Sequence, residues 1–267
     1  MLHLNDRRRR CKKTSSILWT PANLTNLELW LDASDSGTIT KDGSNKVSQW
    51  DDKSGNGNHA TQGTEANQPA YNAADNSVNF DGSNDWMQLP PNVKNSICRD
   101  TNHSIFIVFK ADNPSSSIGC MFLTSSPNYG NNSLAYQIRA SHIRLSYYEY
   151  YDTSGDNEYR SAPFTDTTEK HFMSITHAAN TLHDAFLDGT EITGTERAYR
   201  AQLSGCRIGS AIDNNRFFDG DMFEIIIADS VLSEADRQKI EGYLAHEWDV
   251  ENSLPAGHPY KSSPPYV

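Results

Sequence analysis

The sequence is poor in cysteine and has no long hydrophobic segment. Its four cysteines are Cys11, Cys98, Cys120 and Cys206, and none of them belongs to a Cys-x-x-Cys pair. No stretch approaches the ~20 consecutive apolar residues that span a bilayer, and the first residues lack an apolar core of signal-peptide length. We therefore expect no membrane span, synthesis in the cytoplasm with release by lysis or another route without a signal peptide, and free thiols rather than disulfides.

Positive charge is also scarce, except at the N-terminus. The formal net charge is -11 at pH 7, with 23 Lys and Arg against 34 Asp and Glu. This balance argues against specific nucleic-acid binding, because a phosphate-binding surface needs clustered cations. The exception is a basic arm that consists of Arg7, Arg8, Arg9, Arg10, Lys12 and Lys13. The arm has too few apolar residues to fold alone, which leaves two interpretations: a solvated tail, or an anchor that orders against an acidic partner surface or nucleic acid.

The sequence does contain many short β-strand patterns. Hydrophobic residues make up 36% of the 267 residues, enough for one large domain with a core. The nearly continuous apolar run 104–110 predicts a strand buried on both faces, and the β-branched run 223–228 predicts a second buried strand. Asp188-Gly189 predicts a tight hairpin, because both residues tolerate positive φ. The predicted strands are residues 27–32, 47–51, 78–80, 86–89, 104–110, 120–123, 134–138, 143–147, 172–176, 185–187, 191–193 and 223–228.

One helix is predicted, near the C-terminus. Ser233 and Asp236 are spaced for a capping-box-like start. Four apolar residues follow at helical spacing and form one stripe: Ile240, Tyr243, Leu244 and Trp248. Four acidic residues are expected mostly off this stripe and facing water: Glu234, Asp236, Glu241 and Glu247. The pattern therefore predicts an amphipathic helix that covers part of a sheet.

Several segments resemble LamG-like domains of the concanavalin A-like lectin/glucanase superfamily. Residues 50–60 resemble the opening turn of these domains, residues 80–86 a strand-turn signature, and residues 218–225 a late strand. The C-terminal helix and residues 254–260 resemble an extension found in phage structural and bacterial surface proteins. The resemblance covers roughly residues 24–260 and implies an all-β fold, a two-sheet antiparallel jelly-roll sandwich with one C-terminal amphipathic helix. We accordingly predict a basic arm (1–20), one LamG-like jelly-roll domain (21–250) and an extended proline-rich tail (251–267).

The sequence does not carry an obvious catalytic motif. Glucanases of this superfamily place carboxylates as Glu-x-Asp-x-x-Glu on one strand, whereas Glu224 is isolated among isoleucines. No Gly-x-Ser-x-Gly elbow supports a serine hydrolase. Zinc is not expected either, because His177 and His183 flank a predicted turn rather than sharing ligand spacing. We therefore expect a protein that is not an enzyme.

Calcium binding is a more plausible expectation. Ca²⁺ takes six to eight oxygen ligands, and relatives in the superfamily often carry a calcium ion on the sandwich rim. Six aspartates in predicted turns are candidate ligands: Asp51, Asp52, Asp81, Asp85, Asp213 and Asp219. The alternative is that Asp and Asn fill these turns because they hydrogen-bond their own backbone.

Aromatic residues provide candidates for carbohydrate binding. An aromatic ring packs against the apolar face of a pyranose, while nearby amide and carboxylate groups bind its hydroxyls. The densest aromatic stretch, residues 147–152, offers Tyr148 and Tyr150, and Tyr129 and Trp86 lie in segments that could join the same rim. Because an alternating strand buries half of such residues, these tyrosines are core residues in the alternative interpretation.

Three functional hypotheses follow from these observations. The first is a structural or decoration protein on a virion surface, assembled in the host cytoplasm. In this hypothesis the arm and tail hold it to capsid or tail subunits, and the jelly roll grips host polysaccharide. The second is a free or cell-surface lectin-like adhesion module. The third is a glycoside hydrolase, for which the carboxylate motif is missing. The first hypothesis agrees best with the absence of a signal peptide and with the basic arm.

Overall fold

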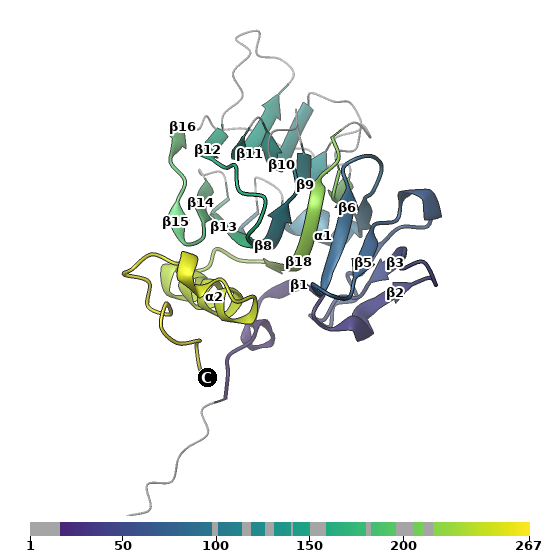
Figure 1. The fold of residues 1–267 in the computed structure, drawn as a ribbon. Helices are drawn as coiled ribbons and strands as arrows, with labels where there is room; N and C mark the ends of the chain where they lie inside the picture. The colour runs from purple at the N-terminus through teal and green to yellow at the C-terminus, as the bar shows by residue number, and fades with distance from the viewer. Residues whose placement is uncertain are drawn as a thin grey trace, which may run out of the picture.

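The protein is an all-β sandwich of two antiparallel sheets with one long helix, as a computed structural model shows (Figure 1). The fold class predicted from the sequence is thereby confirmed. The structure describes residues 17–97, 101–113, 119–125, 131–139, 141–149, 159–179, 183–195, 205–210 and 216–267.

The first sheet has eight strands and lies against the long helix. Seven of them follow the order β15-β14-β13-β8-β18-β6-β5, and β1 pairs with β18 off this path. Their bounds, in that order, are Thr190–Glu191, His183–Leu187, His171–His177, His103–Ala111, Asp219–Ala228, Ser77–Asp81 and Ala70–Asn72, with Leu27–Asp32 for β1.

The second sheet has ten strands, in the order β16-β12-β11-β10-β9-β17-β7-β4-β3-β2. Their bounds, in that order, are Gly194–Thr195, Tyr159–Pro163, His142–Glu149, Asn131–Arg139, Gly119–Ser125, Gly205–Ile208, Met87–Leu89, Ala60–Thr61, Val47–Trp50 and Ile39–Lys41. Short helices join some of these strands: α1 (Pro91–Ser96), η1 (Pro21–Asn23), η2 (Ser36–Thr38), η3 (Glu65–Asn67) and η4 (Glu251–Ser253).

Strands β8 and β18 form the centre of the eight-stranded sheet and are buried on both faces, as their apolar runs predict. In β8, Ile105 and Ile107 face the core between the sheets, whereas Phe106 and Val108 face the long helix. Strand β18 is the longest in the sheet: it pairs with β8 along one edge and with β6 and then β1 along the other. Its buried position explains why it is rich in isoleucine.

Helix α2 (Glu234–Glu247) packs on the outer face of the eight-stranded sheet (Figure 1). The Ser233 hydroxyl accepts a hydrogen bond from the backbone N–H of Asp236, so the predicted cap is confirmed. The predicted apolar stripe is also buried: Ile240, Tyr243, Leu244 and Trp248.

The prediction for Glu241 is wrong, because this residue is fully buried. Its carboxylate accepts hydrogen bonds from Arg237 (2.6 Å), from the hydroxyl of Ser174 and from Nε2 of His258 (3.2 Å). The Arg237 guanidinium in turn lies 3.6 Å from the ring centroid of Phe186. A paired and hydrogen-bonded carboxylate can be buried where an isolated one cannot, so helical charge patterning alone placed Glu241 on the wrong face.

The Asp188-Gly189 hairpin is confirmed. Asp188 and Gly189 have φ values of 51° and 76°, and they connect β14 to β15. Cys206 is buried in β17. No helix in the described part of the chain is long and apolar enough to cross a membrane.

Candidate functional site

The outer face of the ten-stranded sheet carries a row of partly exposed polar side chains. Cross-strand pairing aligns Arg207 of β17, Gln88 of β7, Thr61 of β4, Gln49 of β3 and Thr40 of β2. Their chain neighbours point the other way, into the core. The row follows from period-two alternation in five short strands. It presents amide, hydroxyl and guanidinium groups side by side.

Trp86 lies beside this row and is partly exposed. The guanidinium carbon of Arg207 is 3.7 Å from the ring centroid of Trp86, a cation–π stack. The backbone of Trp86 is fixed on both sides: its N–H donates to the carbonyl of Asn67 (3.1 Å), and its carbonyl accepts from Nε2 of Gln62 (2.9 Å). Trp86 therefore forms a positioned aromatic surface next to hydrogen-bonding groups. We call Trp86, Arg207, Gln88, Thr61 and Gln49 the Trp86 face.

The structure places Tyr148 at a distance from Trp86, which directly precedes β7. Tyr148 belongs to β11, where it pairs with Ser133 of β10. Strands β10, β9 and β17 separate β11 from β7, which corresponds to about 19 Å across the sheet at the usual strand spacing. Tyr129 and Tyr150 lie outside the described residues. Of the four aromatic candidates, Trp86 is the one whose side-chain contacts the structure describes.

Arg207 and Gln88 did not emerge from sequence reasoning. The sequence does contain a pattern that predicts an outward-facing Arg207. It is a single polar residue between the buried Cys206 and Ile208, as in a strand that has one solvent-exposed face. The pairing of Arg207 with Gln88 could not be predicted from the sequence. These residues are 119 positions apart in the chain, and the register between their strands is set by the whole sandwich.

Asp52, one of the candidate calcium ligands, organises the loop of residues 51–58. The Asp52 carboxylate accepts hydrogen bonds from the backbone of Trp30 (2.9 Å) and of Asn58 (2.9 Å), and from both the N–H and the hydroxyl of Ser54. The side-chain amides of Asn56 and Asn58 donate to backbone carbonyls of β1. The loop thereby satisfies the polar groups along the free edge of β1, which pairs with β18 on its other side.

The remaining aspartates cluster at the β6–β7 turn. Asp81 accepts hydrogen bonds from the N–H groups of Ser83 and Asn84, and its backbone is in register with Asp219. Burial, followed by the nearby Asp81, raises the pKa of Asp85 to about 6. Among the described residues, no three His, Cys, Asp or Glu are arranged to hold a metal ion. Asp213 lies outside those residues, and the predicted rim calcium stays a prediction.

Glu224, the residue considered for catalysis, is fully buried beneath α2. Its Oε1 accepts hydrogen bonds from Nε1 of Trp30 (2.7 Å) and the hydroxyl of Tyr243 (3.1 Å), and its Oε2 from Nε1 of Trp248 (2.7 Å). Burial, and then the nearby Asp32, raises its pKa to about 8, whereas the three donors act in the opposite direction. This carboxyl connects β1, β18 and α2, and it has no exposed surface on which to meet a glycan.

Three histidines that are far apart in the sequence come together inside the sandwich. His103, His177 and His183 lie opposite one another on β8, β13 and β14, and each is at most 1% exposed. Their ring centroids are 4.8 Å, 3.8 Å and 5.6 Å apart for the pairs 103–177, 177–183 and 103–183. The rings of His177 and His183 are stacked, a geometry that packs imidazoles together rather than aiming them at one ion.

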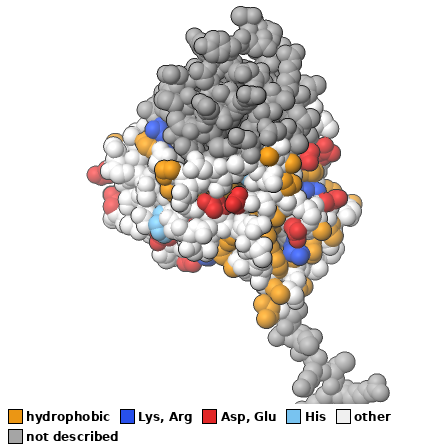
Figure 2. Space-filling model, turned by 180° about the vertical axis from the view of Figure 1, so that it is seen from behind, with side chains coloured by type: hydrophobic (Ala, Val, Ile, Leu, Met, Phe, Trp, Pro, Cys, Tyr) orange, Lys and Arg blue, Asp and Glu red, His pale blue; other side chains and the backbone are white. Residues whose placement is uncertain are grey.

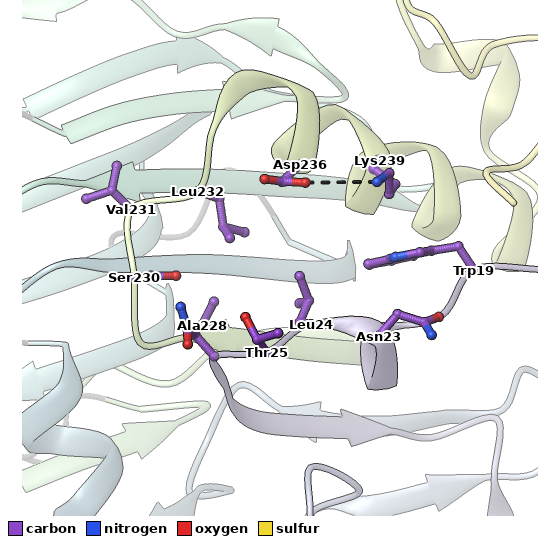
Figure 3. Close-up of a pocket in the computed structure, with 11 residues that line it drawn as sticks. Trp19, Asn23, Leu24, Thr25, Ala228, Ser230, Val231, Leu232, Asp236 and Lys239 are labelled. Carbon is purple, nitrogen blue, oxygen red and sulfur yellow. Dashed lines mark ion pairs between the residues drawn. The ribbon is translucent and has the colours of Figure 1, made fainter. Parts of the chain in front are cut away.

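A pocket of about 300 Å³ opens beside α2 (Figure 3). Its walls come from the segment around η1, the end of β18 and the first turn of α2. Trp19 reaches across it, and Asp236 and Lys239 form an ion pair of 4.0 Å at its edge. The pocket is lined by Trp19, Asn23, Leu24, Thr25, Asn26, Ala228, Ser230, Val231, Leu232, Asp236 and Lys239. It lies on the helix-covered side of the sandwich, apart from the Trp86 face.

Comparison with known proteins identifies the fold. No protein-family model matches the sequence, and no curated protein matches it. The structure of a Trypanosoma rangeli sialidase aligns with a TM-score of 0.56 and 12% identity, over 85% of this chain and 34% of that chain. The CBM40 of a Ruminococcus gnavus IT-sialidase, bound to α2,3 sialyllactose, aligns with a TM-score of 0.49 and 11% identity, over 60% of this chain and 94% of that chain. The likeness to the T. rangeli sialidase supports the β-sandwich fold alone, and the LamG-like relationship stays a prediction.

Proposed function

We propose that the protein is a non-enzymatic carbohydrate-binding module that uses the Trp86 face. The observation that carries this proposal is the fixed, partly exposed Trp86 ring beside a row of amide and hydroxyl side chains. Such a ring packs on the apolar face of a pyranose, and the neighbouring polar groups bind the hydroxyls at its edge. The R. gnavus carbohydrate-binding module, which has sialyllactose bound, is a sandwich of similar architecture, but the argument here depends on this chain's own residues.

The arrangement also indicates that the bound glycan is longer than one sugar. Arg207 stacks on Trp86, so the ring face away from the guanidinium is the one available to a sugar. The polar row continues across β7, β4 and β3 at the usual strand spacing of about 4.8 Å, and therefore reaches beyond a single sugar ring. An oligosaccharide or a polysaccharide is the ligand that fits such a row.

Replacing Trp86 with alanine tests the proposal. We expect Trp86→Ala to weaken binding of the strongest glycan-array hit by about tenfold or more, because an aromatic platform contributes on the order of 1–2 kcal/mol. Titration calorimetry measures the change, with Trp86→Tyr as the matched variant that keeps a ring. Unchanged affinity in Trp86→Ala, or no binding to any glycan on the array, overturns the proposal.

The absence of catalysis is part of the same proposal. Glu224 is the carboxylate nearest to the superfamily's catalytic position, and it is enclosed by Trp30, Tyr243 and Trp248 rather than facing a cleft. A glycoside hydrolase of the two-carboxylate kind needs two carboxyl groups that flank the scissile bond, and the enclosed Glu224 cannot be one of them. Sustained release of sugar from the bound glycan, lost in Glu224→Gln, would contradict this part.

We further propose that the module is displayed on a virion surface, with an extracellular or cell-surface adhesion module as the alternative. The basic arm supports this, since arms of this kind attach a subunit to acidic neighbours. Arg7 to Lys13 lie outside the described residues. Sizing the source lysate on a density gradient separates the two: migration with a megadalton particle supports display on a virion, whereas migration near the 29.8 kDa chain mass excludes it.

A further inference from the structure

The amide of Gln88, in the polar row of the Trp86 face, uses both of its N–H donors within the protein. Its Nε2 donates to the carbonyl of Leu89 (2.8 Å) and to the carbonyl of Cys206 (2.7 Å). A side-chain amide has two N–H donors and one carbonyl acceptor. The hydrogen-bonding group that Gln88 retains is therefore Oε1, which can only accept.

Two further side-chain amides near Trp86 also donate to the protein. Gln49 donates from Nε2 to Oδ1 of Asp51 (2.6 Å), and Asn84, two residues before Trp86, donates from Nδ2 to the carbonyl of Ala66 (2.7 Å). Each of these amides uses one N–H donor in this way and keeps its carbonyl oxygen. The side chains around Trp86 thus lose donors to the protein and retain acceptors.

The negative charge of the protein acts on a ligand in the same direction as these acceptors. The side chain of Asp51 is 36% exposed, and Asp81 is exposed in the turn that leads to Trp86. The chain has a net charge of -11, and Figure 2 shows Asp and Glu side chains spread over one face of the described surface. An anionic group on a ligand is repelled by such surroundings, because like charges placed together are unfavourable.

Two cations near Trp86 are offset within the protein. Arg207 is held over the Trp86 ring at one end of the row, and Asp51 lies at the other end, in contact with Gln49. Lys46 donates to the carbonyl of Gln68 (2.8 Å) and lies 3.8 Å from the carboxylate of Asp85. The positive charge of Arg207 is thus matched along the row by the negative charge of Asp51.

We propose that the Trp86 face binds uncharged, hydroxyl-rich glycans in preference to glycans that carry carboxylate or sulfate groups, and that Gln88 accepts a hydrogen bond from a sugar hydroxyl. This inference rests on the proposed carbohydrate-binding function and specifies its ligand class. A hydroxyl can donate to Oε1 of Gln88, whereas a carboxylate or sulfate oxygen accepts only and leaves Oε1 without a partner. A site built to bind a hydroxyl rejects an analogue that leaves its polar groups unpaired.

Titration calorimetry of the full chain with a matched pair of oligosaccharides tests this preference. The pair consists of the strongest uncharged glycan-array hit that contains hexoses and the same oligosaccharide with its C6 alcohols oxidised to carboxylates. We expect the parent to bind about tenfold or more tightly than the oxidised form. The affinity for the parent should stay constant between about 0.1 M and 1 M salt, over which the Debye length falls from about 10 Å to about 3 Å, because no pair of opposite charges holds it.

The variant Thr61→Lys tests whether the row sets the preference. Thr61 is exposed and pairs with both Gln88 and Gln49, so the substitution places a cation in the middle of the row. It is expected to narrow the preference for the parent by about tenfold and to make binding of the oxidised form weaker at high salt. The control is Thr190→Lys, which adds the same charge at an exposed position of β15 in the other sheet and should leave the preference unchanged.

The outcomes separate this inference from the proposed function. If the oxidised form binds as tightly as its parent, or if the bound glycans are carboxylated or sulfated and Trp86→Ala abolishes their binding, the preference is overturned and carbohydrate binding at the Trp86 face stands. If no glycan binds, the proposed function fails, and the preference fails with it. A preference that Thr61→Lys leaves unchanged also overturns the inference, because the charge and acceptors of the row then do not determine it.

Discussion

Replacing Glu224 with alanine is expected to lower the free energy of unfolding by about 3–5 kcal/mol, because it removes the acceptor of a buried hydrogen-bond network. The substitution leaves three donors without an acceptor: the indole N–H groups of Trp30 and Trp248 and the hydroxyl of Tyr243. An unsatisfied buried donor costs about 1–3 kcal/mol. The cavity left by the missing carboxyl adds to the loss.

The loss should appear first where α2 meets the sheet. Trp30 comes from β1, and Tyr243 and Trp248 come from α2 and its C-terminal end, so Glu224 holds β1 and α2 to β18. In the variant Glu224→Ala, hydrogen exchange followed by mass spectrometry is expected to show faster exchange in α2 than in β8. Urea denaturation measures the global effect.

Two variants control this result. Glu224→Gln keeps the shape and one acceptor oxygen but presents its NH₂ group to one of the donors, so an intermediate loss is expected. Glu234→Ala removes an exposed carboxylate, 77% accessible, from the same helix, and is expected to change stability by less than about 0.5 kcal/mol. A loss below about 1 kcal/mol in Glu224→Ala would contradict the assignment of Glu224 as the anchor of α2.

The pH dependence of stability gives the same residue a second signature. Because the pKa of Glu224 in the folded state is raised to about 8, the folded protein binds this proton more tightly than the unfolded chain. Stability therefore decreases as the pH rises from the unfolded pKa of about 4.5 through the folded pKa of about 8, by about 1.4 kcal/mol for each pH unit between them. In Glu224→Gln this slope is expected to be smaller.

The sequence was sufficient where structure depends on neighbours along the chain. The apolar run of β8 and the isoleucine-rich run of β18 predicted strands buried on both faces, and both are central in the eight-stranded sheet. Ser233 predicted the start of α2, and Asp188-Gly189 the hairpin, because a cap and a turn involve residues only a few positions apart.

Prediction from the sequence failed where residues meet across the fold. Glu224 and Trp30 are separated by 194 positions, and no local pattern shows that an isolated glutamate will receive two indole N–H groups. The sequence predicted that Glu241 faces water, because helical periodicity does not show contacts with residues outside the helix. Those contacts are with Ser174 on β13 and His258 in the C-terminal segment. For the Trp86 face, alternation predicted which residues point outward, but the partners in the row depend on strand register.

The histidine cluster is the second place where a large effect is expected: its contribution to stability should be lost steeply below pH 6.5. Burial, followed by the neighbouring His177, lowers the pKa of His103 to about 3, and burial together with His103 lowers the pKa of His183 well below its ordinary value. Groups with depressed pKa values in the folded state bind protons more readily after unfolding. Stability is therefore fully present above the unfolded pKa of about 6.5 and is lost as the pH falls below it.

The size of the stability loss follows from the lowered pKa values of the histidines. Each pH unit costs about 1.4 kcal/mol for each histidine that stays neutral when folded and is protonated when unfolded. Between pH 6.5 and 4.5, His103 alone therefore costs about 2–3 kcal/mol, and His183 adds to this. Protonation of Glu224 acts in the opposite direction over the same range, so the histidine contribution is best isolated by comparing variants.

The variant His103→Phe isolates the histidine contribution to the pH dependence of stability. Phenylalanine retains a ring beside His177 but cannot be protonated, so the acid limb of the stability curve is expected to flatten. At pH 7.5 the variant loses the hydrogen bond between Nδ1 of His103 and the carbonyl of Thr101, at a cost of about 1 kcal/mol. The variant should be the less stable protein at pH 7.5 and the more stable one at pH 4.5, so the two curves cross.

This crossing distinguishes charge from packing. A variant that merely disturbed the core would be less stable at every pH, and its curve would run parallel to that of the wild type. His142→Phe, on β11 outside the cluster, serves as the control and is expected to leave the acid limb unchanged. Urea denaturation at several pH values between 4.5 and 7.5 measures all three proteins. Parallel curves for His103→Phe and the wild type would show that the buried histidines do not limit stability in acid.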